Sequence, residues 1–241
     1  FLGELGREFQ REFCDVVRKT ANAKGYDVFL FNNFGSYANT FLFDVGEKFV
    51  CKIPVLSEYS GIILLPDTFD IDGMDEMVLQ KVREEANCPV VSVRNGSDDT
   101  YRIVIDDYAT SYNLTDHFIK EHGYKKICYM SGPKGVEDSE NRLNGFMAAM
   151  AHNGIPTEGV IFEGDFWKFK SKEATDYFLQ TYDGKPQAIM CANDFMALGV
   201  CEELKARGIN VPGDIAICGY DDCVEGRAYH PALTTVRMPI K

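Results

Sequence analysis

The chain has 241 residues, of which 45% are hydrophobic and 26% are charged, a balance typical of a globular protein with a large core. Its formal net charge of −12 argues against nucleic-acid binding by this segment, because neutralising phosphates requires clustered Lys and Arg. No run approaches the ~20 apolar residues of a membrane span, and the N-terminal residues lack the order of a signal peptide. We therefore expect a cytoplasmic protein with no membrane partner.

Eight cysteines are spread along the chain without a CxxC pair or a spacing typical of metal ligands. Cys128, Cys191 and Cys218 lie inside apolar runs that resemble strands. This pattern favours buried free thiols in a reducing compartment over a disulfide framework. We expect neither a metal nor a cofactor.

The first half of the chain alternates short apolar runs with segments of helical periodicity. Phe9, Phe13 and Val16 recur at helical spacing, and Gly25 ends that helix. Phe1-Leu2-Gly3 resembles the end of a strand, and residues 32–58 have no clean period. The remaining predicted elements are strands at 28–31, 61–65, 89–93 and 103–105, and helices at 74–86 and 108–121.

The second half continues the alternation, with predicted strands at 126–130, 160–162, 188–192 and 215–218. Asn193 or Asp194 can cap the helix that follows the third of these strands, and Gly208 ends it. Arg142 is expected at the start of another helix. A cation there opposes the helix dipole, so its placement calls for another reason. Strands that alternate with helices predict parallel α/β sheets.

Polar residues follow two of these strands at the point where each strand ends. Asn193 comes after the run that ends at Ala192, and Asp221 comes after Ile215–Cys218. In α/β sheets, ligands bind beyond the carboxyl ends of the strands, where helix N-termini converge. Taken singly, Asn193 is also explained as a helix cap and Asp221 as a strand terminator.

Four motifs carry a resemblance to a known family. They are AND-x-MA-x-G from Ala192, G-x-x-VP-x-D from Gly208, GYDD from Gly219 and PALTTV from Pro231. In this order and spacing they resemble the effector-binding domain of the LacI/GalR family of transcriptional regulators, and the resemblance covers nearly the whole chain, weakening toward the N-terminus. It implies an α/β fold of two Rossmann-like lobes, type I periplasmic-binding-protein-like, whose parallel sheets are flanked by helices. The ligand cleft is expected between an N-terminal lobe of residues 1–123 plus 234–241 and a C-terminal lobe of residues 124–233.

The resemblance also implies a set of ligand-binding residues. An aspartate can accept two hydroxyl hydrogen bonds, an arginine fork can hold a diol or a carboxylate from two points, and aromatic rings give sugar C–H faces an apolar platform. The alternatives are a core role for Phe9, a solvated role for Gln10 and Asp138, and a cap role for Asp106. Asp107 stands where the family usually has Asn. The matched positions are Phe9, Gln10, Asp106, Asp138, Arg142, Phe166, Trp167, Asn193 and Asp221.

No catalytic constellation is evident. The sequence has no GxGxxG, GxxxxGK[ST], GxSxG or HExxH motif. Asp106 and Asp221 could form an acid and base pair, but Arg142 and the resemblance favour a ligand-binding role, so we expect no enzyme. The four histidines fall outside the matched positions: His117, His122, His152 and His230.

The resulting hypothesis is a cytoplasmic ligand-sensing domain that binds a sugar or sugar derivative between two lobes and signals by lobe closure. The resemblance implies a homodimer that contacts DNA only through a domain outside this chain. The alternatives are an extracytoplasmic sugar-binding protein of a transporter and a sensor fused to a signalling enzyme such as a diguanylate cyclase. The VPGD and PALTT motifs and the free cysteines favour the regulator, while the identity of the effector stays open.

Overall fold

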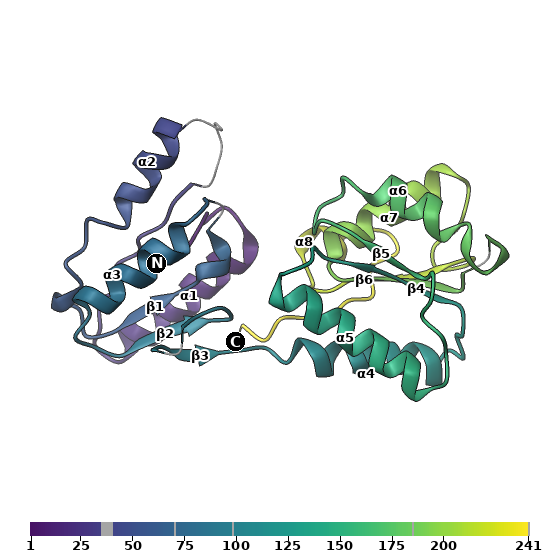
Figure 1. The fold of residues 1–241 in the computed structure, drawn as a ribbon, viewed down its shortest axis with the longest axis horizontal. Helices are drawn as coiled ribbons and strands as arrows, with labels where there is room; N and C mark the ends of the chain where they lie inside the picture. Colours follow the sequence, from purple (N-terminus) through teal and green to yellow (C-terminus); the bar gives the residue numbers. More distant parts are fainter. Residues whose placement is uncertain (35–40, 70, 98, 185, 241) are drawn as a thin grey trace. The chain divides into compact units, whose positions relative to one another are not determined.

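The structure of the protein is a computed structural model that describes residues 1–34, 41–69, 71–97, 99–184 and 186–240, apart from the side chains of residues 41–43 and 184. The chain divides into two compact units, one of Phe1–Ile105 with the chain end from Ile240, and one of Asp106–Pro239. Each unit contains a parallel sheet flanked by helices (Figure 1), which confirms the predicted fold class. The units are described separately below.

The N-terminal unit is built on a three-stranded parallel sheet in the order β1-β2-β3. Ile62 lies opposite Val90, and Val91 lies opposite Tyr101. The strand and helix predictions for this unit hold to within a few residues, except at residues 1–3, where Leu2 makes only an isolated bridge, and at residues 28–31. The elements are α1 (Glu8–Ala23), α2 (Phe41–Val50), η1 (Leu56–Glu58), β1 (Ile62–Leu64), η2 (Pro66–Thr68), α3 (Met74–Glu85), β2 (Val90–Val93) and β3 (Tyr101–Ile103).

The strand predicted at residues 28–31 does not form. Leu2 and Asn32 make one isolated parallel bridge, in which the N–H of Leu2 bonds to the carbonyl oxygen of Phe31 and the N–H of Asn33 bonds to that of Leu2. Pairing does not extend to residues 28–30, and Phe29 stays 66% exposed. Apolar β-branched and aromatic residues alone do not make a strand when no neighbouring edge accepts their hydrogen bonds.

The C-terminal unit is built on a four-stranded parallel sheet in the order β5-β4-β6-β7. Helices α4 and α5 lie on one face of this sheet, and α6 and α7 lie on the other (Figure 1). One continuous core fills the space between, and it includes Phe146, Ile189 and Leu204. The elements are α4 (Asp107–Lys120), β4 (Ile127–Ser131), α5 (Glu137–His152), β5 (Ile161–Glu163), α6 (Ser171–Phe178), η3 (Thr181–Gly184), β6 (Ala188–Cys191), α7 (Asp194–Ala206), β7 (Ala216–Cys218) and α8 (Val224–Ala228).

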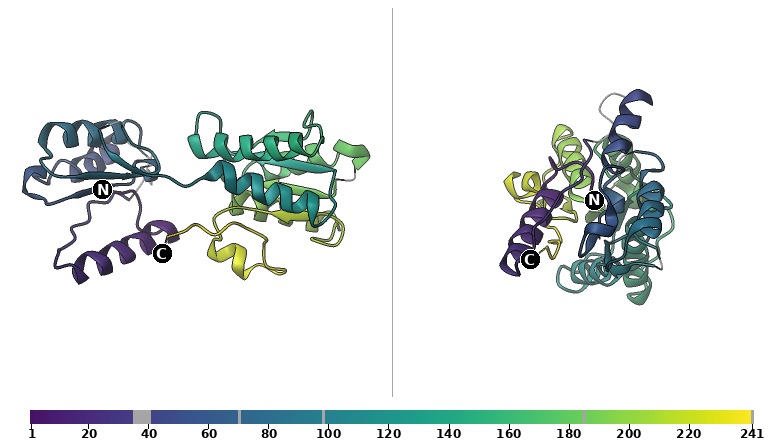
Figure 2. Two further views of the ribbon diagram at one scale, coloured as in Figure 1. Left: turned by 90° about the horizontal axis from the view of Figure 1, so that it is seen from below. Right: turned by 90° about the vertical axis from the view of Figure 1, so that its left-hand side faces the viewer.

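Helix α4 packs closely against α5, side by side in both Figure 1 and Figure 2. Gly145 permits this approach, because a Cβ at that position would lie 2.3 Å from the carbonyl oxygen of Tyr108. The Ser111 hydroxyl donates to the carbonyl oxygen of Arg142 at 2.7 Å. The contacts thus divide the chain before α4, whereas the boundary predicted from the sequence lies after it, at residue 123.

Helix α5 begins earlier than the sequence pattern predicts. It starts at Glu137, so Arg142 lies in its second turn and not at its N-terminus. The first turn carries Glu137, Asp138 and Glu140, which complement the helix dipole. The predicted conflict between Arg142 and the dipole is therefore wrong, and the reason for this arginine lies in its own contacts.

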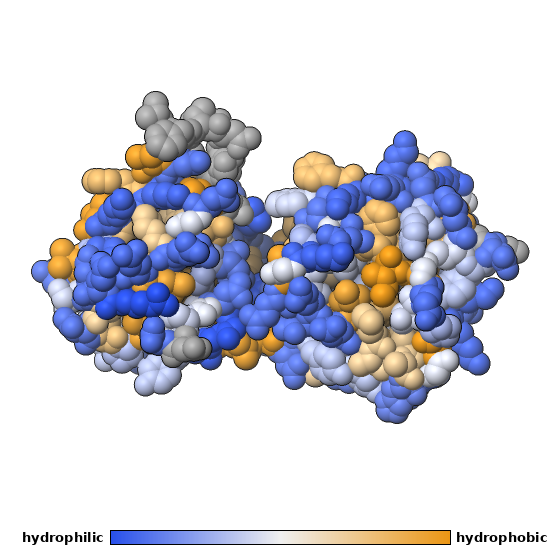
Figure 3. Space-filling model, viewed as in Figure 1, coloured by the Kyte–Doolittle hydropathy of each residue, from blue (hydrophilic) through white to orange (hydrophobic). Residues whose placement is uncertain are grey.

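Figure 3 shows blue residues covering much of the visible face of each unit, with smaller hydrophobic areas among them. Within the described residues, no helix is both long and apolar enough to cross a membrane.

Candidate functional site

Three neighbouring strands of the C-terminal unit end at the same edge of the sheet. Because β4, β6 and β7 are parallel and adjacent, the residues that follow them converge there. These residues are Gly132 after β4, Ala192 and Asn193 after β6, and Gly219 to Asp221 after β7.

Arg142 lies at the centre of this edge with only 3% of its surface exposed. Its Nε donates to Oδ1 of Asp107 at 2.8 Å, and its Nη1 donates to the carbonyl oxygen of Ala192 at 2.6 Å. The guanidinium carbon lies 3.7 Å from the centre of the Tyr220 ring, a cation–π contact. The guanidinium is therefore fixed by α4, by the end of β6 and by the residue that follows Gly219.

Asp221 supplies a second carboxylate to this arginine. Its Oδ1 lies 3.6 Å from Nη1 of Arg142, and its side chain is 37% exposed. Its φ of +112° is in the region that favours glycine, and Asp222 follows with a φ of +57°. This strained turn directs the first carboxylate to Arg142 and the second to Nε of Arg237 at 2.5 Å.

The charges of this cluster depend on one another. Burial lowers the pKa of Arg142, but Asp221 and Asp107 outweigh burial, so the pKa is raised overall and the guanidinium stays charged. Burial also raises the pKa of Tyr220, whose hydroxyl stays neutral. Two carboxylates around one buried cation offset the desolvation of that cation.

Asn193 and Phe166 meet at the same edge. Asn193 caps α7 by accepting from the N–H of Met196 at 2.9 Å, and its amide donates to the carbonyl oxygen of Phe166 at 2.8 Å. Phe166 has a φ of +63°, and its ring covers Gly132 so closely that a Cβ there would lie 2.4 Å from the ring. Asn193 is thus both a cap and a support for the loop that carries this aromatic ring.

Asp194 ties the chain segments behind the cluster together. It accepts from the hydroxyl of Thr235 at 2.6 Å and from the N–H of Cys223 at 2.8 Å. Burial raises its pKa, and these two donors act in the opposite direction. Gly219 is required beside it, because a Cβ there would lie 2.2 Å from a carboxylate oxygen of Asp194.

The structure brings together four of the nine predicted residues: Arg142 with Asp221, and Asn193 with Phe166. Asp106 is the exposed N-cap of α4 and accepts from the N–H of Ala109 at 2.8 Å, the role that the sequence analysis kept as its alternative. Asp138 lies one turn before Arg142 on α5. Trp167 is 43% exposed, and its ring centre lies 5.9 Å from that of Phe195.

The other two predicted residues lie on α1 in the N-terminal unit. Gln10 is buried, with 5% of its surface exposed, and is not solvated as its alternative assumed. Phe9 stacks on Phe13 with ring centres 6.1 Å apart and packs against the small core of that unit.

Sequence reasoning missed Asp107, Tyr220 and Asp194 as members of the cluster. Asp107 follows Asp106 directly, and only the start of α4 decides which of the two faces inward. Tyr220 and Asp194 stand inside the GYDD and AND motifs, so a signal was present, but their contacts depend on the pairing of distant strands.

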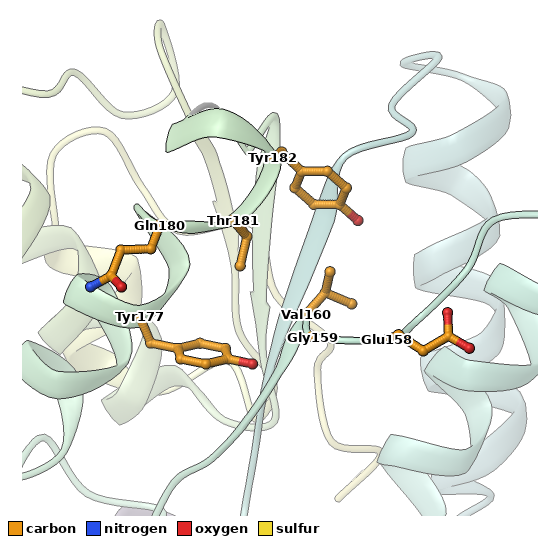
Figure 4. A pocket seen from close by; sticks show the side chains of 7 residues that line it. All are labelled: Glu158, Gly159, Val160, Tyr177, Gln180, Thr181 and Tyr182. Carbon is orange, nitrogen blue, oxygen red and sulfur yellow. The ribbon is translucent and has the colours of Figure 1, made fainter.

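A separate hollow of about 360 Å³ lies at the opposite, amino end of the same sheet (Figure 4). Tyr177, Tyr182 and Glu158 contribute to its lining, and none of the residues around Arg142 does. All eight cysteines are free thiols. Among the residues described, no group of three or more His, Cys, Asp or Glu side chains is arranged to hold a metal ion.

Comparisons with known proteins agree with this architecture. Residues 115–241 match the family model described as a periplasmic binding protein-like domain. The transcriptional repressor PurR of Photobacterium profundum is 32% identical over 234 residues, which are 96% of this chain and 66% of that protein. The probable repressor ExuR of Bacillus subtilis is 28% identical over 185 residues, covering 76% of this chain and 54% of that protein. The chain thus spans 54–66% of the length of these curated relatives.

Solved structures share the fold. A LacI-family regulatory protein from Chloroflexus aggregans superposes with a TM-score of 0.76 at 24% identity, covering 100% of this chain and 82% of that one. The regulator CelR in complex with cellobiose superposes with a TM-score of 0.76 at 22% identity, covering 99% of this chain and 71% of that one. The lac repressor dimer bound to operator and the anti-inducer ONPF superposes with a TM-score of 0.74 at 22% identity, covering 99% of this chain and 79% of that one. With the family model and the repressor relatives, this fold places the chain in the periplasmic binding protein-like family, as an effector-binding domain of the LacI/GalR type.

Proposed function

We propose that this chain senses a sugar or sugar derivative for a LacI/GalR-type transcriptional repressor. The cluster around Arg142 carries the proposal, because it holds a buried cation beside a part-exposed carboxylate at the carboxyl end of a parallel sheet. Such a site binds and orients a ligand without transforming it. The repressor relatives, which are not enzymes, support the same reading.

The chemistry of the cluster favours a ligand that both donates and accepts hydrogen bonds. Asp221 is an acceptor, whereas Arg142 is a donor. A hydroxyl group satisfies both, and neighbouring hydroxyls on a sugar ring can bridge the 3.6 Å between Oδ1 of Asp221 and Nη1 of Arg142. The ring of Phe166, which covers Gly132, offers an apolar face for the C–H groups of the sugar.

We propose further that the effector binds between the two units and favours their closed arrangement. A ligand shifts such an equilibrium only to the extent that it binds one arrangement more tightly. Phe9, Gln10, Asp106, Asp138 and Trp167 are proposed as additional contacts. Small-angle X-ray scattering checks closure, because the radius of gyration should fall when the effector is added.

The output of the proposed sensor lies outside this chain. We propose a cytoplasmic homodimer that contacts DNA through a separate domain, and the similar structure of the lac repressor is a dimer bound to operator. The net charge of −12 supports DNA binding by a separate domain, because an acidic domain repels the phosphate backbone.

A thermal-shift screen of the purified chain tests the proposal with sugars, sugar phosphates, purine bases and amino acids. A ligand present at a hundred times its Kd adds ~2.7 kcal/mol, which raises the Tm of a chain of this size by about 5–10 °C. Asp221→Asn should reduce the shift strongly, because it replaces a charged carboxylate by an amide with one weaker acceptor oxygen and little change in size. Asp176→Asn is the matched control, since Asp176 is an exposed partner of Arg207 on another surface.

Two results would contradict the proposal. A shift with purine bases or amino acids, and none with any sugar, overturns the sugar assignment but keeps the sensor. A sugar shift that persists unchanged in Asp221→Asn overturns the placement of the site.

A further inference from the structure

Two exposed histidines converge at the end of α4. Nε2 of His117 and Nε2 of His122 lie 3.2 Å apart, and their ring planes are nearly perpendicular at 87°. Both histidines lie outside the cluster around Arg142, and no part of the proposed effector site uses them.

The way α4 ends brings these two rings together. The N–H of Glu121 still bonds to the carbonyl oxygen of His117 at 2.9 Å, and Gly123 then takes a φ of +70°. This reversal lets the N–H of Tyr124 bond back to the carbonyl oxygen of Phe118 at 3.2 Å. His122 is thereby folded over the last turn of the helix, within reach of His117.

Aromatic neighbours hold both rings in place. Phe118 is 4% exposed, and its ring centre lies 6.1 Å from His117 and 5.7 Å from His122. Tyr124 stacks on His122 with ring centres 5.5 Å apart. Rings that are already packed lose little side-chain freedom when a ligand fixes them further.

The separation of the two nitrogens matches that of two ligands on one metal ion. Imidazole nitrogens bind zinc at about 2.0–2.1 Å, so two of them lie about 3.3 Å apart at a tetrahedral angle and about 2.9 Å apart at a right angle. The observed 3.2 Å falls between these values. Without an ion, the two nitrogens are within hydrogen-bond distance of each other, and a metal ion replaces that contact.

The neighbouring charges permit a cation at this position. Lys120 lies in the same turn, but its ammonium group is paired with Asp116 at 2.8 Å. The adjacent Glu121 adds negative charge on the exposed side. A divalent ion here is therefore not opposed by an unpaired cation of the same helical turn.

We propose that His117 and His122 form a chelating surface site for a divalent transition-metal ion that prefers nitrogen ligands, such as Ni²⁺, Cu²⁺ or Zn²⁺. The two imidazoles supply two ligands, and water completes the coordination. The spacing of the cysteines predicts no metal site, whereas this site depends on the geometry of a helix end that brings two histidines together.

Isothermal titration of the untagged full chain with Ni²⁺, and separately with Zn²⁺, tests the proposal. The wild type should bind one ion per chain. His117→Gln and His122→Gln should each weaken binding at least about tenfold, since even changes outside the ligand set cost ~10–100-fold. His152→Gln is the control, because Nδ1 of His152 contacts the hydroxyl of Tyr112 and makes no contact with the two paired nitrogens.

Proton NMR of the imidazole groups identifies the ligands directly. Paramagnetic Ni²⁺ should broaden the signals of His117 and His122 before those of His152 and His230. A wild type that binds no ion overturns the proposal. So does binding that survives in both Gln variants, or that disappears when the thiols of the half-buried Cys88 and Cys223 are blocked.

Discussion

In the C-terminal unit every residue of β4, β6 and β7 is buried, whereas in the N-terminal unit all three residues of β3 are exposed. The C-terminal sheet carries helices on both faces and shares one core. The N-terminal core is divided into two smaller clusters, around Met74 and around Leu65. The proposed site residues around Arg142 therefore rest on the better packed unit, where a fixed geometry costs least to maintain.

Deleting an aromatic ring is expected to give the largest difference between the units in unfolding free energy. Phe146 is fully buried and stacks on Tyr129 with ring centres 4.6 Å apart, so Phe146→Ala should cost about 3–5 kcal/mol of unfolding free energy. Tyr101→Ala, at a residue that is 72% exposed on β3, should change it by less than ~0.5 kcal/mol. Urea denaturation of each variant measures both, and equal costs would contradict the comparison.

Removing one partner of an ion pair should give the next largest difference in unfolding free energy between the two units. Asp107→Asn leaves the 3% exposed guanidinium of Arg142 without its closest carboxylate and should cost about 3 kcal/mol. In the N-terminal unit, Asp99 pairs with Arg83 at 3.0 Å, but both side chains are more than half exposed, so Asp99→Asn should cost at most ~1 kcal/mol. Chemical denaturation at low and high salt should show that only the exposed pair depends on ionic strength.

Two helix glycines should respond in opposite directions to alanine. Gly145→Ala forces a Cβ to within 2.3 Å of the Tyr108 carbonyl oxygen, so α4 must move and stability should fall by about 1–3 kcal/mol. Gly46 lies in α2 with nothing within 4 Å, and Gly46→Ala should raise helix stability by up to ~1 kcal/mol. Thermal unfolding would refute this prediction if both variants shifted Tm in the same direction.

The smallest expected difference between the units is in the labelling rate of two buried thiols that have the same pKa. Burial raises the pKa of Cys51 in the N-terminal unit and of Cys128 in the C-terminal unit to about 11 in each case. At pH 8 both are therefore mostly protonated, and labelling by a disulfide reagent should speed up as the pH rises toward 11. At any one pH, Cys51 should react several-fold faster, because the divided core opens more readily. Mass spectrometry of labelled peptides measures the two rates, and equal rates would mean that the units open together.

Much of the fold could be predicted from the sequence, because most apolar runs and helix ends are local signals. Gly25, Gly123 and Gly208 end α1, α4 and α7 with positive φ angles, as their positions indicate. The strand at residues 28–31 failed because a strand depends on a neighbouring edge, which no local pattern records.

The candidate site could be predicted only in part. Asn193 and Asp221 follow strands and belong to motifs, so sequence alone singled them out. Asp107 could not be distinguished from Asp106 in this way, because their side chains differ only in the direction that the first turn of α4 gives them. The buried contacts of Arg142 join residues 107, 142, 192 and 220, which no local spacing connects.

The left-handed turn at Asp221 and Asp222 directs two consecutive carboxylates to two different arginines. The first carboxylate faces Arg142, and the second holds Arg237 on the segment that leaves the C-terminal unit toward Ile240. The N–H of Asp221 also bonds to the carbonyl oxygen of Val236 at 2.9 Å. Any backbone rotation that redirects the Asp221 carboxylate must therefore either move the segment around Val236 and Arg237 or break these two hydrogen bonds.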